Sequence, residues 1–230
     1  MERILGKLDG KEIKYSMIVL DPHTVDAKNI YKLLIGCIVP RPIAFVSTKS
    51  SEGILNLAPF SFFMGVCANP PTLAFSISQK GSGGGTKDTL ANIRETKEFV
   101  VNVVSEEMGE RMNITAAEFP SHIDEFKVAG FTPIASDKIS VPRVKESPIQ
   151  MECRLSQIVE INSSQPLGAS VVFGEIICFH LAEEIYDNNF HIDIAALQPI
   201  GRLAGNSYSR TNDRFDLVRP KMDDILYNQK

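Results

Sequence analysis

A short apolar stretch with embedded prolines, residues 39–63, constrains the fold of this chain more than any other part of the sequence. Residues 43–48 are apolar and β-prone, and a proline on each side of Arg41 opposes helix formation. Residues 49–53 (KSSEG) have the composition of a turn, and residues 54–60 return as a second strand. The stretch therefore predicts an antiparallel β-hairpin.

Polar side chains lie near the strand ends of this predicted hairpin, inside otherwise apolar sequence. They are Ser47, Thr48, Asn56 and Ser61. A buried amide or hydroxyl costs free energy unless it finds a hydrogen-bond partner, so a bound ligand would explain these residues. Bonds that cap the strand ends through nearby backbone would explain them equally well, and the hairpin alone leaves both interpretations open.

The remaining sequence continues a β-rich pattern with one helical interruption. Strands are predicted over residues 15–20, 72–78, 99–104, 149–161 and 169–181, and helices over 24–35 and from Leu90 onward. Residues 106–130 predict a helical insertion that ends at Gly130. Strands without β-α-β alternation predict one mainly β domain over 1–230, an antiparallel barrel with helical insertions. Residues 210–230 are expected to form a solvated tail or an arm on a partner chain.

Apolar residues in the helical insertion are predicted to belong to the core rather than to a binding site. They form two sets at helical spacing: Met108, Met112 and Ile114, and Ile123, Phe126, Val128 and Phe131. Methionine and aromatic residues at such spacing are usually packed against the rest of the protein.

A glycine-rich segment precedes the predicted helix at Leu90. Residues 81–89 (GSGGGTKDT) allow unusual backbone angles and lead into a helix N-terminus, where free amides favour a phosphate. Lys87 would add a positive charge and Thr89 a hydroxyl. The segment matches neither the Walker loop nor the Gly-x-Gly-x-x-Gly fingerprint. A solvated loop in which Thr86 or Asp88 caps the helix is the competing interpretation.

Charge and apolar run length restrict the partners of the chain. A net charge of −4 and a pI near 5.6 argue against a nucleic-acid-binding surface. The longest apolar run, residues 62–68, is too short to span a bilayer, and the first residues lack a signal-peptide pattern. The four cysteines form no Cys-x-x-Cys pair. We therefore expect a cytoplasmic protein that binds neither nucleic acid nor membrane.

The histidines give no sign of metal or nucleophile chemistry. His23, His122, His180 and His191 lack metal-ligand spacing, and none lies in a nucleophile motif. The sequence therefore predicts no metal site, and His180 is predicted to be packed in a strand. No pair of carboxylates stands out as acid and base, so an enzyme built on this chain would depend on a bound cofactor.

Two motifs in the hairpin carry a resemblance to a known family. Residues 41–48 (RPIAFVST) and 56–63 (NLAPFSFF) resemble the signature of the flavin reductase-like family, whose members are FMN-binding split β-barrels. The resemblance spans about 39–210, continuing through 69–72, 87–93, 98–102, 147–148, 152–153 and, more weakly, 201–203. It implies an antiparallel Greek-key split β-barrel that forms a homodimer, with FMN near the subunit interface.

The resemblance also implies a set of flavin contacts. The candidates are Arg41, Ser47, Thr48, Asn56, Leu57, Ala58, Pro59, Phe60, Ser61, Lys87, Thr89, Arg202 and Tyr208. Ser47 and Thr48 are expected near the ribityl-phosphate, with Lys87 and Thr89 as phosphate partners. Residues 56–61 would offer side-chain and backbone hydrogen bonds to the polar edge of the isoalloxazine ring.

Three of these candidates have more general expected roles. Arg41 is a candidate for contact with the phosphate or with the negative charge of a reduced flavin. Arg202 and Tyr208 are expected to close the site. No side chain is expected to be catalytic by itself, since the flavin carries the chemistry.

The resemblance implies an FMN-dependent oxidoreductase that reduces flavin or a related acceptor by hydride transfer. NAD(P)H is the candidate electron donor, although no separate dinucleotide fingerprint is present. A small molecule or a protein would accept the electrons. The alternative is a flavoredoxin-like protein that holds FMN and takes electrons from a protein partner. A flavin-binding barrel without turnover is a third interpretation.

Overall fold

A computed structural model describes residues 3–8, 11–79 and 85–222 of the chain. Residues 81–84 of the glycine-rich segment and residues 223–230 of the predicted tail lie outside the described residues. The chain divides into two compact units, Met1–Ile38 and Val39–Lys230, and each is described by itself.

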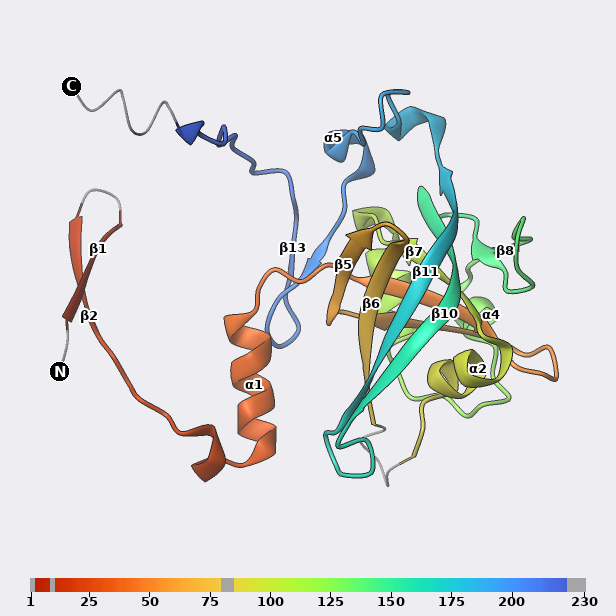
Figure 1. Ribbon diagram of the computed structural model, residues 1–230, viewed down its shortest axis with the longest axis horizontal. Coiled ribbons are helices and arrows are strands. Elements are labelled where there is room, and N and C mark those ends of the chain that lie inside the picture. Colours follow the sequence, from red (N-terminus) through yellow and green to blue (C-terminus); the bar gives the residue numbers. More distant parts are fainter. Residues whose placement is uncertain (1–2, 9–10, 80–84, 223–230) are drawn as a thin grey trace. The chain divides into compact units, whose positions relative to one another are not determined.

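The first unit contains a two-stranded hairpin and one α-helix (Figure 1). Strand β1 (Arg3–Leu8) pairs antiparallel with β2 (Lys11–Ser16), and a short 3-10 turn, η1 (Pro22–Thr24), precedes α1 (Ala27–Cys37). The strand predicted over 15–20 is therefore wrong. Its β-prone start belongs to β2, which pairs residue by residue with β1 and ends at Ser16.

Helix α1 confirms the helix predicted near 24–35, with a boundary that moves toward the C-terminus. The side chain of Asp26 accepts a hydrogen bond from the amide of Asn29 at 3.1 Å, which caps the helix. Residues before Ala27 are excluded from the helix by this cap.

The second unit is built on a seven-stranded antiparallel sheet (Figure 1). Its strands are β3 (Ala44–Lys49), β4 (Leu55–Phe60), β5 (Phe63–Ala68), β6 (Pro71–Ser78), β7 (Glu98–Val103), β10 (Ile149–Ile161) and β11 (Ala169–Leu181). They lie in the order β4-β3-β7-β10-β11-β6-β5, so β4 and β5 form its two edges and the sheet is not closed. This is a mainly β, antiparallel split barrel, as the sequence predicts.

The hairpin predicted from residues 43–60 is confirmed by β3 and β4, whose residues pair from Ala44 with Phe60 to Lys49 with Leu55. The strands predicted at 72–78, 99–104, 149–161 and 169–181 correspond to β6, β7, β10 and β11. Strand β5 was not predicted. Most of its side chains are exposed at the sheet edge. Its sequence therefore lacks the alternation of apolar and polar residues by which a half-buried strand is predicted.

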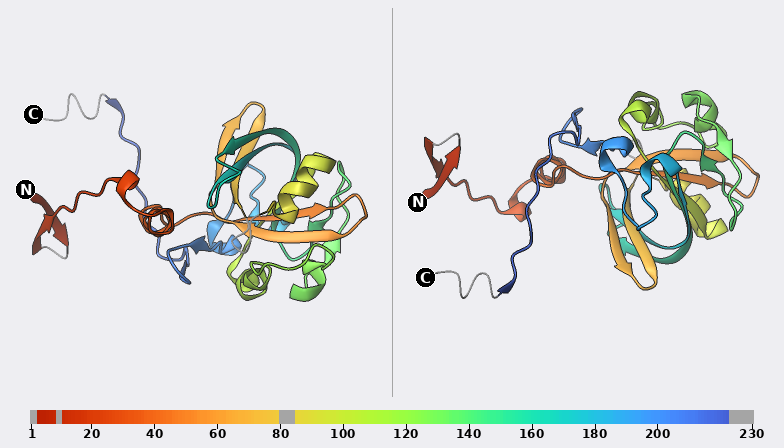
Figure 2. Two further views of the ribbon diagram at one scale, coloured as in Figure 1. Left: turned by 90° about the horizontal axis from the view of Figure 1, so that it is seen from below. Right: turned by 90° about the horizontal axis from the view of Figure 1, so that it is seen from above.

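Helices cover both faces of the β3–β4 hairpin (Figure 2). Alternate residues of β3 point to opposite faces, so Ala44 and Val46 pack with Leu90 and Ile93 of α2 (Asp88–Thr96). Phe45 lies on the other face, in the cluster formed with the helical insertion. The start of α2 and the insertion are thereby brought to the same edge strand, β4.

The helical insertion contains η2 (Glu106–Met108), α3 (Gly109–Ile114) and α4 (Glu125–Ala129). Met108, Met112, Phe126 and Phe131 are buried in one cluster, which confirms their predicted place in the core. The prediction is wrong for Ile114 and Val128, whose side chains are 45% and 46% exposed. Helices this short present only one side to the sheet. Gly130 ends α4 in the left-handed conformation (φ 70°), as predicted.

Smaller elements complete the second unit. They are β8 (Pro133–Ile134), β9 (Arg143–Val144), η3 (Glu183–Ile185), α5 (Ile194–Leu197), β12 (Gly201–Arg202) and β13 (Tyr208–Ser209). No helix in the described part of the chain has both the length and the apolar character needed to cross a membrane.

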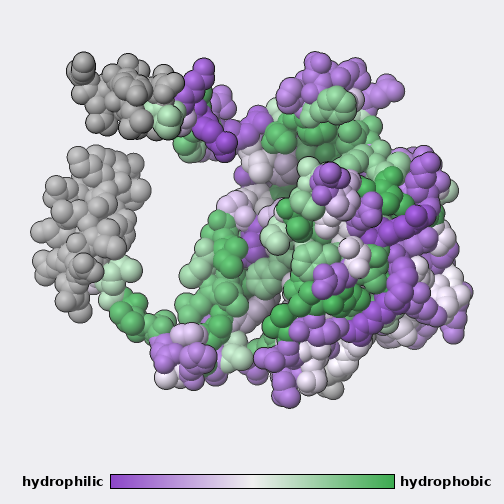
Figure 3. Space-filling view, viewed as in Figure 1, coloured by the Kyte–Doolittle hydropathy of each residue, from purple (hydrophilic) through white to green (hydrophobic). Residues whose placement is uncertain are grey.

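Helix α1 in the first unit and strand β5 in the second unit both expose apolar side chains. None of the residues of α1 is buried, and Tyr31, Leu33 and Leu34 are all more than 40% exposed; the face of α1 in view is mostly hydrophobic (Figure 3). In the second unit, the edge strand β5 exposes Met64 and Val66. Exposed apolar groups on regular elements are typical of surfaces that bind another protein.

Candidate functional site

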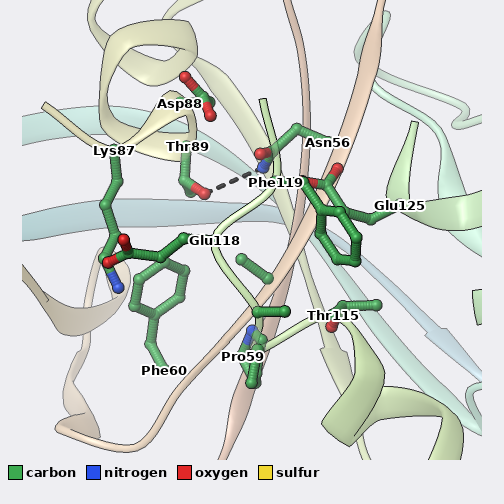
Figure 4. Close-up of a pocket in the computed structure, with 13 residues that line it drawn as sticks. Asn56, Pro59, Phe60, Lys87, Asp88, Thr89, Thr115, Glu118, Phe119 and Glu125 are labelled. Carbon is green, nitrogen blue, oxygen red and sulfur yellow. Dashed lines mark hydrogen bonds between the residues drawn. The ribbon is translucent and has the colours of Figure 1, made fainter. Parts of the chain in front are cut away.

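A small polar pocket lies where the edge strand β4 meets the start of α2 and the helical insertion (Figure 4). Strand β4 contributes residues 56 and 58–60, the start of α2 contributes 87–89, and the insertion contributes 115–119 and Glu125. The cavity volume is about 80 Å³. Sites for drug-sized ligands measure about 300–1,000 Å³, so this cavity accommodates one small polar group rather than a ring system.

A buried hydrogen-bond network joins the pocket wall to the sheet. The Asn56 amide nitrogen donates to Thr89 Oγ1 at 2.9 Å and to Thr48 Oγ1 at 3.1 Å. Asn92 donates to the same Thr48 oxygen at 3.0 Å. Side-chain partners within the protein therefore account for Thr48 and Asn56, whereas the capping interpretation expected bonds to nearby backbone.

The N-terminus of α2 faces this pocket. Lys87 occupies the N-cap position, which the competing interpretation gave to Thr86 or Asp88, and its side chain makes no cap hydrogen bond. The first amides of a helix and its dipole favour an anion. The Lys87 ammonium lies 5.7 Å from the centroid of the Phe60 ring, and Figure 4 shows Glu118 beside Lys87. The start of α2 is therefore accessible from the pocket, which the acidic residues Asp88 and Glu118 line together with Lys87.

Glu125 brings a buried carboxyl group to the opposite wall. Glu125 is the first residue of α4 and is 6% exposed. Its carboxylate accepts a hydrogen bond from the Leu57 amide at 3.2 Å. Burial raises the pKa of Glu125 to about 7, with a smaller contribution from the negative charges of Asp88 and Asp124. The carboxyl group is therefore neutral in weak acid and ionises near neutral pH.

The structure gathers six of the predicted flavin contacts at this pocket: Asn56, Ala58, Pro59, Phe60, Lys87 and Thr89. Leu57 lies on the opposite face of β4 and is fully buried in the core, although its amide reaches Glu125. Thr48 lies behind the pocket wall, bonded to Asn56.

Ser47, which is expected near the ribityl-phosphate, does not line this pocket. Strand alternation points its side chain to the face that carries the insertion, where its hydroxyl donates to the Pro142 carbonyl at 2.7 Å. Ser47 is completely buried there. Its polar group is explained by this hydrogen bond.

The other four candidates form a separate group near the C-terminal segment. Arg41 donates to Ser61 Oγ at 3.3 Å, and its backbone pairs with that of Arg202. The Arg202 guanidinium lies 4.5 Å from the centroid of the Tyr208 ring, and the Tyr208 hydroxyl donates to Asn113 at 3.1 Å. None of the four lines the pocket at α2.

Sequence reasoning missed the part of the pocket that comes from the insertion. The sequence pattern places only the apolar positions of the insertion in the core, and the family resemblance implies only that the insertion can border the flavin or the dimer partner, so neither singles out residues 115–119 or Glu125. The one local signal was the glutamate itself, an ionisable residue directly before Phe126 at the start of an apolar helical pattern.

A second buried carboxylate lies far from any of these candidates in sequence. Glu152 is fully buried, and its Oε1 lies 2.6 Å from His180 Nε2, which confirms that His180 is packed rather than free. The Cys178 thiol lies 3.5 Å from the same nitrogen. Burial and the nearby Glu152 and Asp137 carboxylates raise the pKa of the Cys178 thiol, so this cysteine is not an activated nucleophile.

The second unit is an antiparallel split barrel with a helix start beside its edge strand β4. The family model described as "Flavin reductase like domain" matches residues 35–196. The chain therefore belongs to the flavin reductase-like family.

Relatives and solved structures agree with this membership. The chain is 39% identical over 206 residues to the protein YwrF of Bacillus subtilis, covering 89% of this chain and 100% of the relative. It is similar to the crystal structure of nitrilotriacetate monooxygenase component B from Bacillus cereus (39% identity, 88% and 100% covered, TM-score 0.83). It is also similar to the 2-nitrobenzoate 2-nitroreductase NbaA of Pseudomonas fluorescens (35% identity, 89% and 98% covered, TM-score 0.79).

Proposed function

We propose that this protein binds FMN and uses it to transfer electrons from NAD(P)H to flavin or a related acceptor. Membership of the flavin reductase-like family supports an oxidoreductase. Two solved structures to which the chain is at least 35% identical are a monooxygenase component and a nitroreductase, and both names are those of redox proteins. The observation that carries the choice of FMN is the helix start at the pocket, where the Lys87 ammonium and the Thr89 hydroxyl lie beside the first amides of α2.

The residues present fit the phosphate end of FMN. Lys87 offers a cation, Thr89 a hydroxyl and the start of α2 a positive dipole, which is the donor set that phosphate prefers. The cavity of about 80 Å³ suits a phosphate group and is too small for the isoalloxazine ring. The ring would therefore extend beyond the cavity, with Phe60 and residues 58–59 of β4 at the mouth.

In this proposal the protein supplies binding and orientation. Lys87 and the α2 amides hold the phosphate, and the Asn56–Thr89 hydrogen bond keeps the Thr89 hydroxyl in place beside it. Bound FMN would supply the redox chemistry, accepting a hydride from NAD(P)H and passing electrons to an acceptor. Protonated Glu125 lowers the negative charge of the pocket and so favours an anionic ligand in weak acid.

An anaerobic titration tests the function. Protein loaded with FMN should lose its yellow absorbance when NADH or NADPH is added, and regain it with free flavin as acceptor. Bleaching at a rate no faster than that of free FMN would reject the NAD(P)H-linked activity. Reduction by a protein donor alone would then identify the flavoredoxin-like electron carrier.

We also propose that the protein acts as a homodimer in the cytoplasm, with FMN near the subunit interface. The exposed apolar residues of α1 and β5 are suited to contact with a second copy. Cys37 and Cys67 are exposed free thiols, which fits a reducing compartment. Static light scattering of the FMN-loaded protein should give twice the mass of the chain; a flavin-loaded monomer would contradict the dimer.

A further inference from the structure

The two longest strands bring three side chains with potential metal-ligating atoms to one face of the sheet. Glu152 on β10 lies opposite Cys178 on β11, and Gln150 lies opposite His180. Directly opposed residues of an antiparallel pair share a face, as do residues two apart on one strand. Cys178, His180 and Glu152 therefore project on the same side, and the register shift at Ile177 lies beside them.

The loop that crosses this face supplies the fourth group. Glu152 Oε1 accepts a hydrogen bond from the Asp137 amide at 2.7 Å, and Oε2 accepts one from the Lys138 amide at 2.8 Å. These bonds hold the Asp137 backbone directly over the buried carboxylate. Ligand atoms of Asp137, Cys178 and His180 consequently lie within 4.8 Å of one another.

One distance in this group can be compared with a zinc coordination shell. Tetrahedral zinc, with bonds of about 2.0–2.3 Å to nitrogen, oxygen and sulfur, separates its ligand atoms by roughly 3.3–3.6 Å. The Cys178 sulfur lies 3.5 Å from His180 Nε2, which agrees with this spacing. The 2.6 Å between His180 Nε2 and Glu152 Oε1 is the length of a hydrogen bond, so Glu152 orients the His180 ring and is not part of the three-ligand group.

We propose that Asp137, Cys178 and His180 bind a zinc ion. Thiolate, imidazole and carboxylate are the ligands that zinc takes in proteins, and three protein ligands leave the fourth position to water. The ion would join the 135–141 loop to strand β11, and Glu152 would position the loop and the His180 ring through its hydrogen bonds. Lys138 and Arg143 act electrostatically on Cys178 and favour its thiolate.

The site has a route to solvent. His180 lines a groove of about 730 Å³ that also contains Arg143, Lys145 and Gln150, and Asp137 is exposed. A metal ion can therefore reach the ligands without unfolding of the sheet. The groove and the ligands are separate in lining residues from the pocket at α2, so zinc binding does not depend on the proposed flavin function.

Zinc affinity of chelator-treated, full-length protein tests the proposal, measured by competition with a chromophoric zinc indicator. The wild-type chain should bind one zinc ion per chain. Cys178→Ser and Asp137→Asn should each weaken binding at least about tenfold, the smallest loss expected even for changes outside the ligand shell. Asp137 is exposed, so the Asp137→Asn chain should keep its fold.

Two controls separate this site from adventitious binding. His191 pairs with Asp187 at 3.1 Å on the surface, and Cys67 is an exposed thiol, so His191→Gln and Cys67→Ser test an unrelated histidine–carboxylate pair and thiol. Both variants should bind zinc as the wild type does. With cobalt, the wild type should show d–d absorption at wavelengths longer than flavin absorbs, and Cys178→Ser should lose it. Unchanged zinc affinity in Cys178→Ser and Asp137→Asn, or loss of zinc in Cys67→Ser, would overturn the proposal.

Discussion

Replacing Lys87 with alanine is expected to weaken FMN binding about 10- to 100-fold while leaving riboflavin binding nearly unchanged. A hydrogen bond to a charged group contributes about 1.5–3 kcal/mol, and each 1.4 kcal/mol is about a tenfold change in affinity. Riboflavin lacks the phosphate, so its affinity for the protein should not depend on the Lys87 charge. Calorimetric or fluorescence titration of both flavins measures the difference directly.

The variant should fold normally, because the Lys87 side chain provides no cap bond to α2. Lys127→Ala is the matched control, since Lys127 lies on α4, its side chain is 85% exposed, and it does not line the pocket. It should bind both flavins as the wild type does. An equal loss of FMN and riboflavin affinity in Lys87→Ala would reject the phosphate role.

Replacing Glu125 with glutamine is expected to stabilise the protein by about 3 kcal/mol at about pH 8 and to have little effect near pH 5. The pKa of Glu125 is raised from 4.5 to about 7 in the folded protein, so between these values the folded state binds more protons than the unfolded state. The free energy of unfolding therefore decreases as pH rises through this window. Each pKa unit corresponds to about 1.4 kcal/mol, so the shift from 4.5 to about 7 gives the expected change of about 3 kcal/mol in the free energy of unfolding.

Glutamine keeps an oxygen that can accept the Leu57 amide and has no charge to bury. Urea denaturation between about pH 5 and pH 8 should show a falling free energy of unfolding for the wild type, and a smaller fall for Glu125→Gln. Glu110→Gln removes an exposed carboxylate from the same insertion and should follow the wild type. If the free energy of unfolding changed with pH at the same rate in the wild type and in Glu125→Gln, a raised pKa at Glu125 would be refuted.

Local sequence patterns predicted much of the sheet. The proline-bounded 43–60 hairpin and the alternating strands at 72–78 and 149–161 have periodicities that only a strand satisfies. The face of each strand was harder to predict. Because helices cover both sides of β3, Ser47 and Thr48 are both completely buried, and the sequence cannot tell which one faces α2.

Groups that meet through tertiary structure could not be predicted. Glu125 reaches the pocket only because α4 packs against β4, 68 residues earlier in the chain. Asp137, Cys178 and His180 meet because a loop crosses two strands beside a register shift, and no spacing rule describes that arrangement. The candidates Arg41 and Arg202 are adjacent to each other through a backbone pairing that only the C-terminal segment provides.

A crystal structure of the FMN-loaded protein tests the central claim most directly, since it locates the phosphate. We expect the phosphate oxygens within hydrogen-bonding distance of the Lys87 ammonium and the first amides of α2, with the Thr89 hydroxyl beside them. A phosphate bound instead by Arg41 and Arg202, with the pocket at α2 unchanged, would contradict this account.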